Sequence, residues 1–200
     1  MFARTLVIWL IAAVALPTGE PFWDHFLRVA DAGGGRLLLI LLDVNGDGRK
    51  EIFLAPSETC GNGGCIWHVY SPTPGLNQVR YLGEAGFSPS GYRFTRSTHT
   101  LTDCWHMSAA DCTLREDRFQ SGEMTHLGLG TCRSADADCQ AELARIARWQ
   151  REEAPPLLSA DVPESGELGK LEWHQTRGST AIPATGAPDF NVLVVAPNPK

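Results

Sequence analysis

Two short apolar runs enclose a polar segment in the first third of the chain. Leu37–Leu42 is an unbroken run of six aliphatic residues, and Ile52–Ala55 is a second apolar run that stops at Pro56. Runs of this length, bounded by Gly and Pro, are more typical of buried strands than of helices. The pattern predicts two neighbouring strands joined by the mostly polar segment 43–51.

Farther along, apolar and polar positions alternate over several short stretches, as they do in strands with one buried face. The Ser121-Gly122 pair predicts the turn of a hairpin between two of these strands. The stretches predict strands at residues 66–70, 78–82, 92–94, 113–119 and 124–127. We therefore expect a mainly β (α+β) fold: an antiparallel sheet domain with one C-terminal helix and an extended tail.

The C-terminal helix is predicted over residues 136–153. Cys139, Leu143 and Ile146 share one face at helical spacing, and Pro155 cannot continue the helix. A shorter helix is predicted over residues 21–31, because three glycines follow it closely.

Residues 154–200 hold seven of the thirteen prolines, which favours a loose, extended tail. Two stretches within it, 168–173 and 190–196, are apolar enough to dock as strands. The second stretch carries no charge and has high β-propensity, so we expect the sheet or a partner to cover it.

The polar segment between the first two strands has the spacing of a calcium loop. Asp43, Asn45 and Asp47 stand at alternate positions, the carbonyl of Arg49 follows, and Glu51 can close the shell. Calcium takes about six to eight oxygen ligands of this kind. The alternative is an ordinary surface turn, where Asp, Asn and Gly are common. We predict that Ca²⁺ binds through Asp43, Asn45, Asp47, Arg49 and Glu51.

The predicted strands distinguish this loop from an EF-hand, which has flanking helices and a bidentate Glu where Leu54 stands here. The strand-flanked loop resembles the FG-GAP or VCBS unit of integrin-type β-propellers over residues 37–70. That resemblance implies calcium binding in the loop. One loop without an internal repeat predicts a single unit rather than a complete propeller.

A broader resemblance extends from this loop to about Cys132. The chain is similar to a group of exported bacterial proteins with one such loop, a CGxGGC segment and a final hairpin rich in Tyr and Phe. The matching segments are DVNGDGRKEIF, CGNGGCIWHVY, TDCWHMSAADC and LREDRFQSGEM. This resemblance implies an architecture and no particular activity.

Residues 1–15 have the pattern of a signal peptide. Arg4 precedes ten apolar residues, and Ala13-Val14-Ala15 offers a cleavage site. An uncleaved anchor is the alternative, but ten residues are too few to span a bilayer. We expect a periplasmic or secreted protein with no membrane association after cleavage, whose disulfide-stapled β domain covers residues 16–153.

Six cysteines in an exported chain predict disulfides. Fifteen connectivities are open, and proximity favours three local pairs: Cys60 with Cys65, Cys104 with Cys112, and Cys132 with Cys139. Three glycines between Cys60 and Cys65 allow a sharp return of the backbone. A zinc site at Cys60, Cys65 and His68 is a second interpretation, for which no fourth ligand has a suitable spacing.

Charge and motifs restrict the function. The formal net charge of −6 disfavours nucleic acid and anionic membranes as partners. No nucleophile elbow, metalloprotease motif or phosphate loop occurs in the sequence, so we predict a non-catalytic periplasmic binding module that binds Ca²⁺ and a protein. An inhibitor or immunity protein that acts on a toxin or a cell-wall enzyme is an alternative. A hydrolase that uses His106 with Asp103 or Asp111 is another.

Three tryptophans lie in predicted structure or beside it: Trp67, Trp105 and Trp149. Aromatic side chains on strands can form a platform for a sugar or a peptide, but they more often fill a core. Their spacing is irregular, so we expect core positions.

Overall fold

The computed structural model describes residues 25, 26, 28, 35–73, 78–106, 111–133, 135–162, 171, 174 and 175. The signal peptide predicted at 1–15 and the strand predicted at 190–196 lie outside these residues. Of the helix predicted at 21–31, residues 25, 26 and 28 are described and are helical. The elements are β1 (Arg36–Leu42), β2 (Glu51–Pro56), η1 (Ser57–Thr59), β3 (Cys65–Thr73), β4 (Gln78–Phe87), β5 (Tyr92–Thr95), β6 (Thr100–His106), β7 (Asp111–Gln120), β8 (Glu123–Arg133), α2 (Ala137–Glu152), β9 (Leu158–Asp161) and β10 (His174–Gln175).

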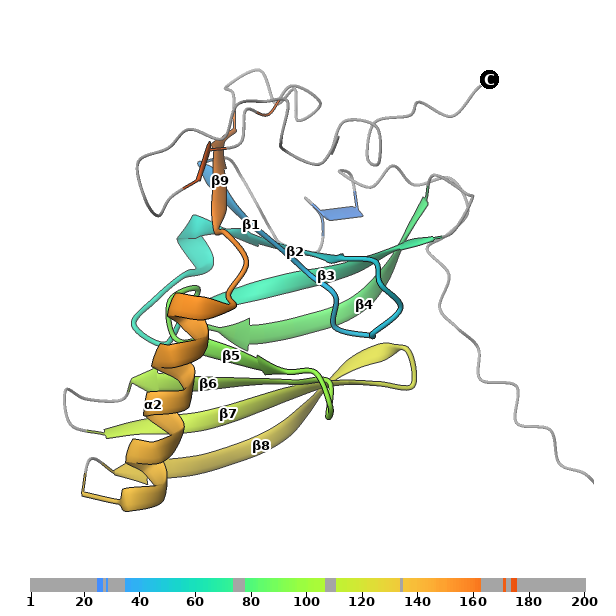
Figure 1. The fold of residues 1–200 in the computed structure, drawn as a ribbon. Helices are drawn as coiled ribbons and strands as arrows, with labels where there is room; N and C mark the ends of the chain where they lie inside the picture. The colour runs from blue at the N-terminus through green and yellow to red at the C-terminus, as the bar shows by residue number, and fades with distance from the viewer. Residues whose placement is uncertain are drawn as a thin grey trace, which may run out of the picture.

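The described strands form two antiparallel sheets. The six-stranded sheet has the order β10-β9-β1-β2-β3-β4, and the four-stranded sheet has the order β5-β6-β7-β8. Figure 1 shows α2 lying across the four-stranded sheet, while β1 and β2 meet at the loop that joins them. This architecture confirms the prediction of a mainly β fold with one C-terminal helix.

Helix α2 begins where the sequence predicts it. Asp136 is its N-cap, because the Asp136 carboxylate accepts a hydrogen bond from the amide of Asp138 at 3.0 Å. The buried face of the helix carries Cys139, Ile146 and Trp149. The predicted apolar stripe is thus the side that packs on the protein.

The proline-rich tail supplies strands to the six-stranded sheet. β9 pairs with β1, β10 pairs with β9, and Leu158 and Ala160 are buried. The prediction of a loose tail therefore does not hold for residues 158–161, because their apolar side chains complete the core. Of the stretch predicted to dock at 168–173, only Leu171 is described; it is buried but lies outside any strand.

Two apolar cores cover opposite faces of the six-stranded sheet. The inner core lies between the sheets and includes Trp67 and Phe87, whose rings stack with centroids 4.9 Å apart, together with Leu101. The outer core includes Leu54 and, from the N-terminal segment, Phe26. Because β1 and β2 are covered on both faces, their sequences are continuous apolar runs rather than alternating ones.

Three disulfides confirm the local pairings that proximity favours: Cys60–Cys65, Cys104–Cys112 and Cys132–Cys139. The zinc interpretation is wrong, since the sulfur atoms of both its cysteines are bonded to each other. The other four cysteines gather with Ile146 in one buried cluster. In it, Cys104–Cys112 joins β6 to β7, and Cys132–Cys139 fastens α2 to β8 of the four-stranded sheet.

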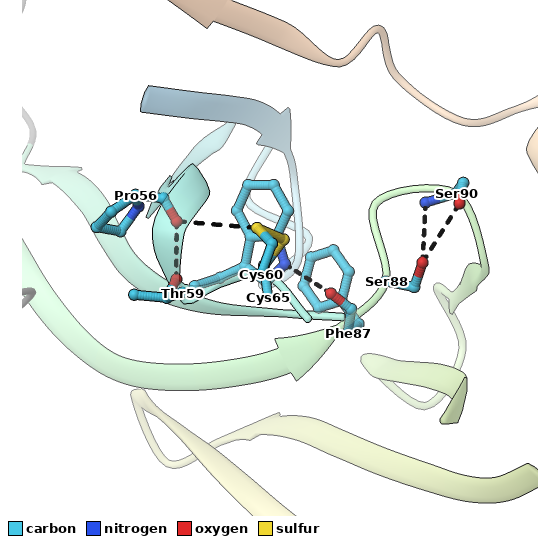
Figure 2. Close-up of a disulfide and its surroundings, with 8 residues drawn as sticks. Pro56, Thr59, Cys60, Cys65, Phe87, Ser88 and Ser90 are labelled. Carbon is cyan, nitrogen blue, oxygen red and sulfur yellow. Dashed lines mark hydrogen bonds between the residues drawn. A yellow bond between two sulfur atoms is a disulfide. The ribbon is translucent and has the colours of Figure 1, made fainter. Parts of the chain in front are cut away.

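Figure 2 shows the Cys60–Cys65 disulfide beside the end of β4. Within its loop, the amide of Gly61 donates to the carbonyl of Gly64 at 2.8 Å, and the amide of Gly64 donates back at 3.0 Å. Gly64 has φ of +107°, and a Cβ there would stand 2.6 Å from the carbonyl carbon of Phe87. Both the backbone conformation and the close approach to β4 therefore require glycine.

We expect Gly64→Ala to lower the free energy of unfolding by about 2 kcal/mol, because it adds a left-handed strain and a backbone clash. Gly61→Ala is the matched control: a Cβ at Gly61 meets nothing within 4 Å. Urea denaturation of the oxidised proteins measures the difference. Equal unfolding midpoints for the two variants would contradict this account.

Candidate functional site

The loop between β1 and β2 is organised by its own acidic side chains. The two carboxylate oxygens of Asp43 accept hydrogen bonds from the amides of Gly46 at 2.8 Å and Gly48 at 3.0 Å. Asp47 accepts from the amide of Arg49 at 2.8 Å. Gly46 and Gly48 have φ of +79° and +83°, which is the left-handed region that a tight loop of this kind needs. The spacing recognised in the sequence thus produces a compact, internally bonded loop.

Glu51, the first residue of β2, lies beneath this loop and is completely buried. Its carboxylate accepts from the amide of Val44 at 2.8 Å, from Asn45 Nδ2 at 2.8 Å and from Ser71 Oγ at 3.0 Å. Burial raises the pKa of Glu51, the hydrogen bonds from Val44 and Ser71 oppose the rise, and Asp47 and Asp43 add to it. A buried carboxylate under two further acids is a strong acceptor for positive charge.

Asn45 occupies the centre of this group. Its side-chain Nδ2 donates to Glu51 at 2.8 Å and to Asp47 at 3.2 Å, while its Oδ1 accepts from the amide of Asp47 at 2.8 Å. An amide nitrogen therefore bridges two carboxylates, a role that a cation also performs. The oxygen-rich donor set of Asp43, Asn45, Asp47 and Glu51 fits a hard cation once the Asn45 amide turns its oxygen inward.

The side chains do not already form a metal cage. Among the described residues, no group of three or more His, Cys, Asp or Glu side chains is placed to hold a metal ion. The carbonyl of Arg49 is the remaining predicted ligand, and the amide of the same residue is bonded to Asp47. Calcium binding at these residues thus stays a prediction.

His99 connects this loop to the four-stranded sheet. His99 Nδ1 lies 2.7 Å from the carbonyl of Val44, and a carbonyl only accepts, so Nδ1 carries the proton. The backbone of His99 has φ of 52°, which is rare for a residue with a side chain. Beside it, a cleft of about 500 Å³ is lined by residues that include Asp43, Lys50, Phe94, Arg96 and His99.

A second polar group lies where β6 and β7 face β4. Asp103 and Arg115 are cross-strand partners, and Asp103 Oδ2 lies 3.6 Å from Arg115 Nη2. Asp117 follows the register shift in the pairing of β7 with β8. Its carboxylate accepts hydrogen bonds from the amide of Gly86 at 2.8 Å and from His126 Nδ1 at 2.9 Å. This group ties the edge of the six-stranded sheet to the four-stranded sheet.

Asp103 is poorly satisfied. It is 1% exposed, and neither of its carboxylate oxygens has a hydrogen-bond partner within the part of the chain that the structure describes. Burial raises the pKa of Asp103 to about 7, although the nearby amides of Ser88 and Cys104 and the charge of Arg115 oppose the rise. The acid is therefore only partly ionised near neutral pH.

The tryptophans divide between core and surface. Trp67 and Trp149 are core residues as predicted, but Trp105 is 38% exposed. The guanidinium carbon of Arg115 lies 4.0 Å from the centroid of the Trp105 ring. The sequence did not single out Arg115, because an arginine in an alternating hairpin is normally a solvated residue.

The residues of the predicted hydrolase are not brought into one described arrangement. Asp103 is paired with Arg115, and His106 and Asp111 are described only as backbone, at the ends of β6 and β7. His68, the histidine of the zinc interpretation, has its Nδ1 3.3 Å from Tyr81 Oη, and burial lowers its pKa. The hydrolase remains an untested alternative.

No family model and no curated protein matches this chain. Among solved structures, a Xanthomonas type IV secretion system related protein is similar, with a TM-score of 0.36 and 13% sequence identity. The match covers 68% of this chain and 56% of that chain, so this chain spans just over half the length of the protein that it matches.

The described helices contain no segment long and apolar enough to cross a membrane. Three disulfides are typical of oxidising compartments, so the structure is consistent with an extracellular or periplasmic protein.

Proposed function

We propose that this chain is an exported calcium-binding β domain that serves as a non-catalytic binding module. The observation that carries the proposal is the completely buried carboxylate of Glu51 beneath a loop that already holds two further acids. Three negative charges at one place repel one another unless a positive charge joins them. A bound divalent cation would remove this repulsion and stabilise the loop.

Asp43, Asn45, Asp47 and Glu51 would hold the ion by their side chains, and Arg49 by its carbonyl. The ion would supply two positive charges and no reaction chemistry. Its effect is structural, because the loop joins two strands of the inner and outer cores. Extracellular calcium modules have dissociation constants of about 10⁻⁴–10⁻³ M, and we expect the same range here.

We expect added calcium to stabilise the fold by about 1.4 kcal/mol when its free concentration is ten times the dissociation constant. Thermal unfolding followed by circular dichroism, in calcium and in chelator, measures the shift. Asp47→Ala should remove the shift, since it deletes one ligand and one charge. Glu116→Ala is the control, because Glu116 is exposed on β7 and its loss changes the net charge equally. An equal calcium shift in wild type and Asp47→Ala, or no shift in either, would refute calcium binding at this loop.

The binding role has separate support. The part of the chain that the structure describes combines rigid sheets, three disulfides and an exposed tryptophan held by its neighbours. Rigid elements that present an aromatic side chain suit recognition of another molecule.

A further inference from the structure

The cleft beside His99 lies where three segments of the chain meet: the loop between β1 and β2, the turn between β5 and β6, and the residues that follow α2. Its volume of about 500 Å³ is that of a small-molecule site, for which about 300–1,000 Å³ is usual. The loop contributes Lys50, the turn contributes Arg96, and the end of α2 contributes Glu153. Three charged side chains from distant parts of the sequence therefore line one hollow.

The walls of this cleft are tied together by contacts that need no ligand. His99 Nδ1 donates to the carbonyl of Val44 at 2.7 Å, which joins the turn to the loop. Gln150 Nε2 donates to the carbonyl of Tyr92 at 2.7 Å, and the rings of Tyr92 and Trp149 have centroids 4.8 Å apart, which joins α2 to β5. A cleft that is formed in advance loses little conformational entropy when a ligand enters.

The three charged side chains are exposed and have no partner among the described residues. Within that part of the chain, neither Lys50 nor Arg96 nor Glu153 takes part in an ion pair or a side-chain hydrogen bond. Opposite charges therefore line the same cleft without pairing with one another. Their donors and acceptors are available to a ligand that lies between them.

The fourth charged side chain of the cleft, Asp43, is already used by its own loop. Its two oxygens accept from the amides of Gly46 at 2.8 Å and Gly48 at 3.0 Å. Glu153 is therefore the acid that remains to receive a positive group. A multiply charged anion such as phosphate is a poor match, because Asp43 and Glu153 would both repel it.

The remaining lining is largely apolar. Phe94 is buried, and Leu41 and Pro155 are partly buried, yet all three border the cleft. An apolar group would cover these side chains and gain from leaving water. The guanidinium of Arg96 presents a planar fork of donors that matches a carboxylate, and Lys50 adds a second positive charge. The lining thus combines a place for a carboxylate, a place for an ammonium group and an apolar surface.

We propose that this cleft binds a small zwitterion with an apolar body, which is the chemistry of a free apolar amino acid or of a short apolar peptide with charged ends. The carboxylate bonds to Arg96 and Lys50, the ammonium group bonds to Glu153, and the apolar side chain covers Phe94 and Leu41. The proposal rests on the proposed binding function, whose ligand class it names, but not on calcium.

The test is calorimetric titration of the oxidised full-length protein with leucine and with leucyl-leucine, in chelator. We expect binding, and the tighter of the two ligands identifies the free amino acid or the peptide as the source. N-acetyl-leucine lacks the ammonium group and leucinamide lacks the carboxylate. Each should bind about 10-fold more weakly than leucine, since each loses a hydrogen bond between charged groups.

Two variants assign the ends of the ligand to their residues. Arg96→Gln should weaken leucine binding about 10-fold, whereas Arg148→Gln, which removes the same charge from an exposed position on α2, should not. Glu153→Gln should weaken leucine binding about 10-fold and leave the affinity for N-acetyl-leucine unchanged. Glu152→Gln is its matched control, because Glu152 is exposed and lies outside the lining of the cleft.

The proposal is overturned if neither zwitterion binds at concentrations up to about 10 mM. It is also overturned if the acetylated and amidated ligands bind as tightly as leucine, or if the control variants weaken binding as much as their counterparts do. Every titration is done in chelator, so failure of the loop to bind calcium cannot produce a negative result. A negative result, in turn, leaves the expected effect of calcium on thermal unfolding unchanged.

Discussion

Glu51→Ala is expected to lower the free energy of unfolding by about 3–4 kcal/mol, the largest effect of any single change in the loop. The substitution breaks three hydrogen bonds, donated by the amide of Val44, Asn45 Nδ2 and Ser71 Oγ, of which only Asn45 Nδ2 keeps a second acceptor, Asp47. Val44 is completely buried, so water cannot replace the lost acceptor at its amide. Burial of an unpaired donor costs far more than an ordinary exposed hydrogen bond contributes.

Two further variants separate the hydrogen bonds from the charge. Glu51→Gln keeps the size and one acceptor oxygen, and we expect it to cost about half as much as Glu51→Ala. Ser71→Ala removes one donor together with its need for an acceptor, and should cost about 1 kcal/mol. Chemical denaturation in chelator measures all three without any contribution from calcium. A loss below about 1 kcal/mol for Glu51→Ala would show that the carboxylate does not hold the loop.

The contribution of Asp103 to the stability of the protein should fall as the pH rises from about 4 to about 7. Its pKa is raised to about 7 in the folded protein from an ordinary value of 3.8. Between these values the folded chain keeps the proton and the unfolded chain releases it. The stabilisation is therefore complete below pH 4 and lost once the pH exceeds 7. The shift in the pKa of Asp103 corresponds to at most about 4 kcal/mol of stabilisation, and we expect about 2–3 kcal/mol after solvent relaxation around the carboxyl group.

Asp103→Asn isolates this contribution, since it keeps the size of the side chain and removes the titration. We expect the slope of unfolding free energy against pH to be shallower in the variant than in wild type over this range. Glu51, whose pKa burial also raises, contributes a slope of the same sign to both proteins, and His68, whose pKa burial lowers, contributes an opposite one. Urea midpoints at closely spaced pH values measure the difference, and parallel slopes would refute it.

The elements that could be predicted are those whose sequence signals lie within a few neighbouring residues. β1, the loop and β2 follow from two apolar runs and the nine-residue loop pattern between them, and the helix follows from one apolar stripe and one proline pair. The disulfide partners are close in the sequence, so proximity was sufficient to pair them.

What the sequence did not indicate depends on distant contacts. β9 has a short Leu-Ser-Ala segment between prolines, and only its pairing with β1 makes it a strand. β6 carries polar residues on both faces, and Thr100, Thr102 and Asp103 are all buried. An alternation of apolar and polar residues, the sequence signal of a strand, does not predict this burial. The positions of Ser71 and His99 beside the loop come from other strands and turns, so loop spacing cannot identify them.

The order of strands in the six-stranded sheet has a consequence for how the protein acquires its structure. β1 lies between β2 and β9, and its partner Asp161 follows Arg36 by 125 positions in the chain. As the chain folds from its N-terminus, β1 and β2 can form a hairpin early, while the other edge of β1 presents free backbone groups along six aliphatic residues. Such an edge is a template for pairing with other chains. This edge of β1 is covered only when β9 pairs with it, after nearly the whole domain has formed. The late pairing of β9 is therefore also the step that protects the protein from aggregation.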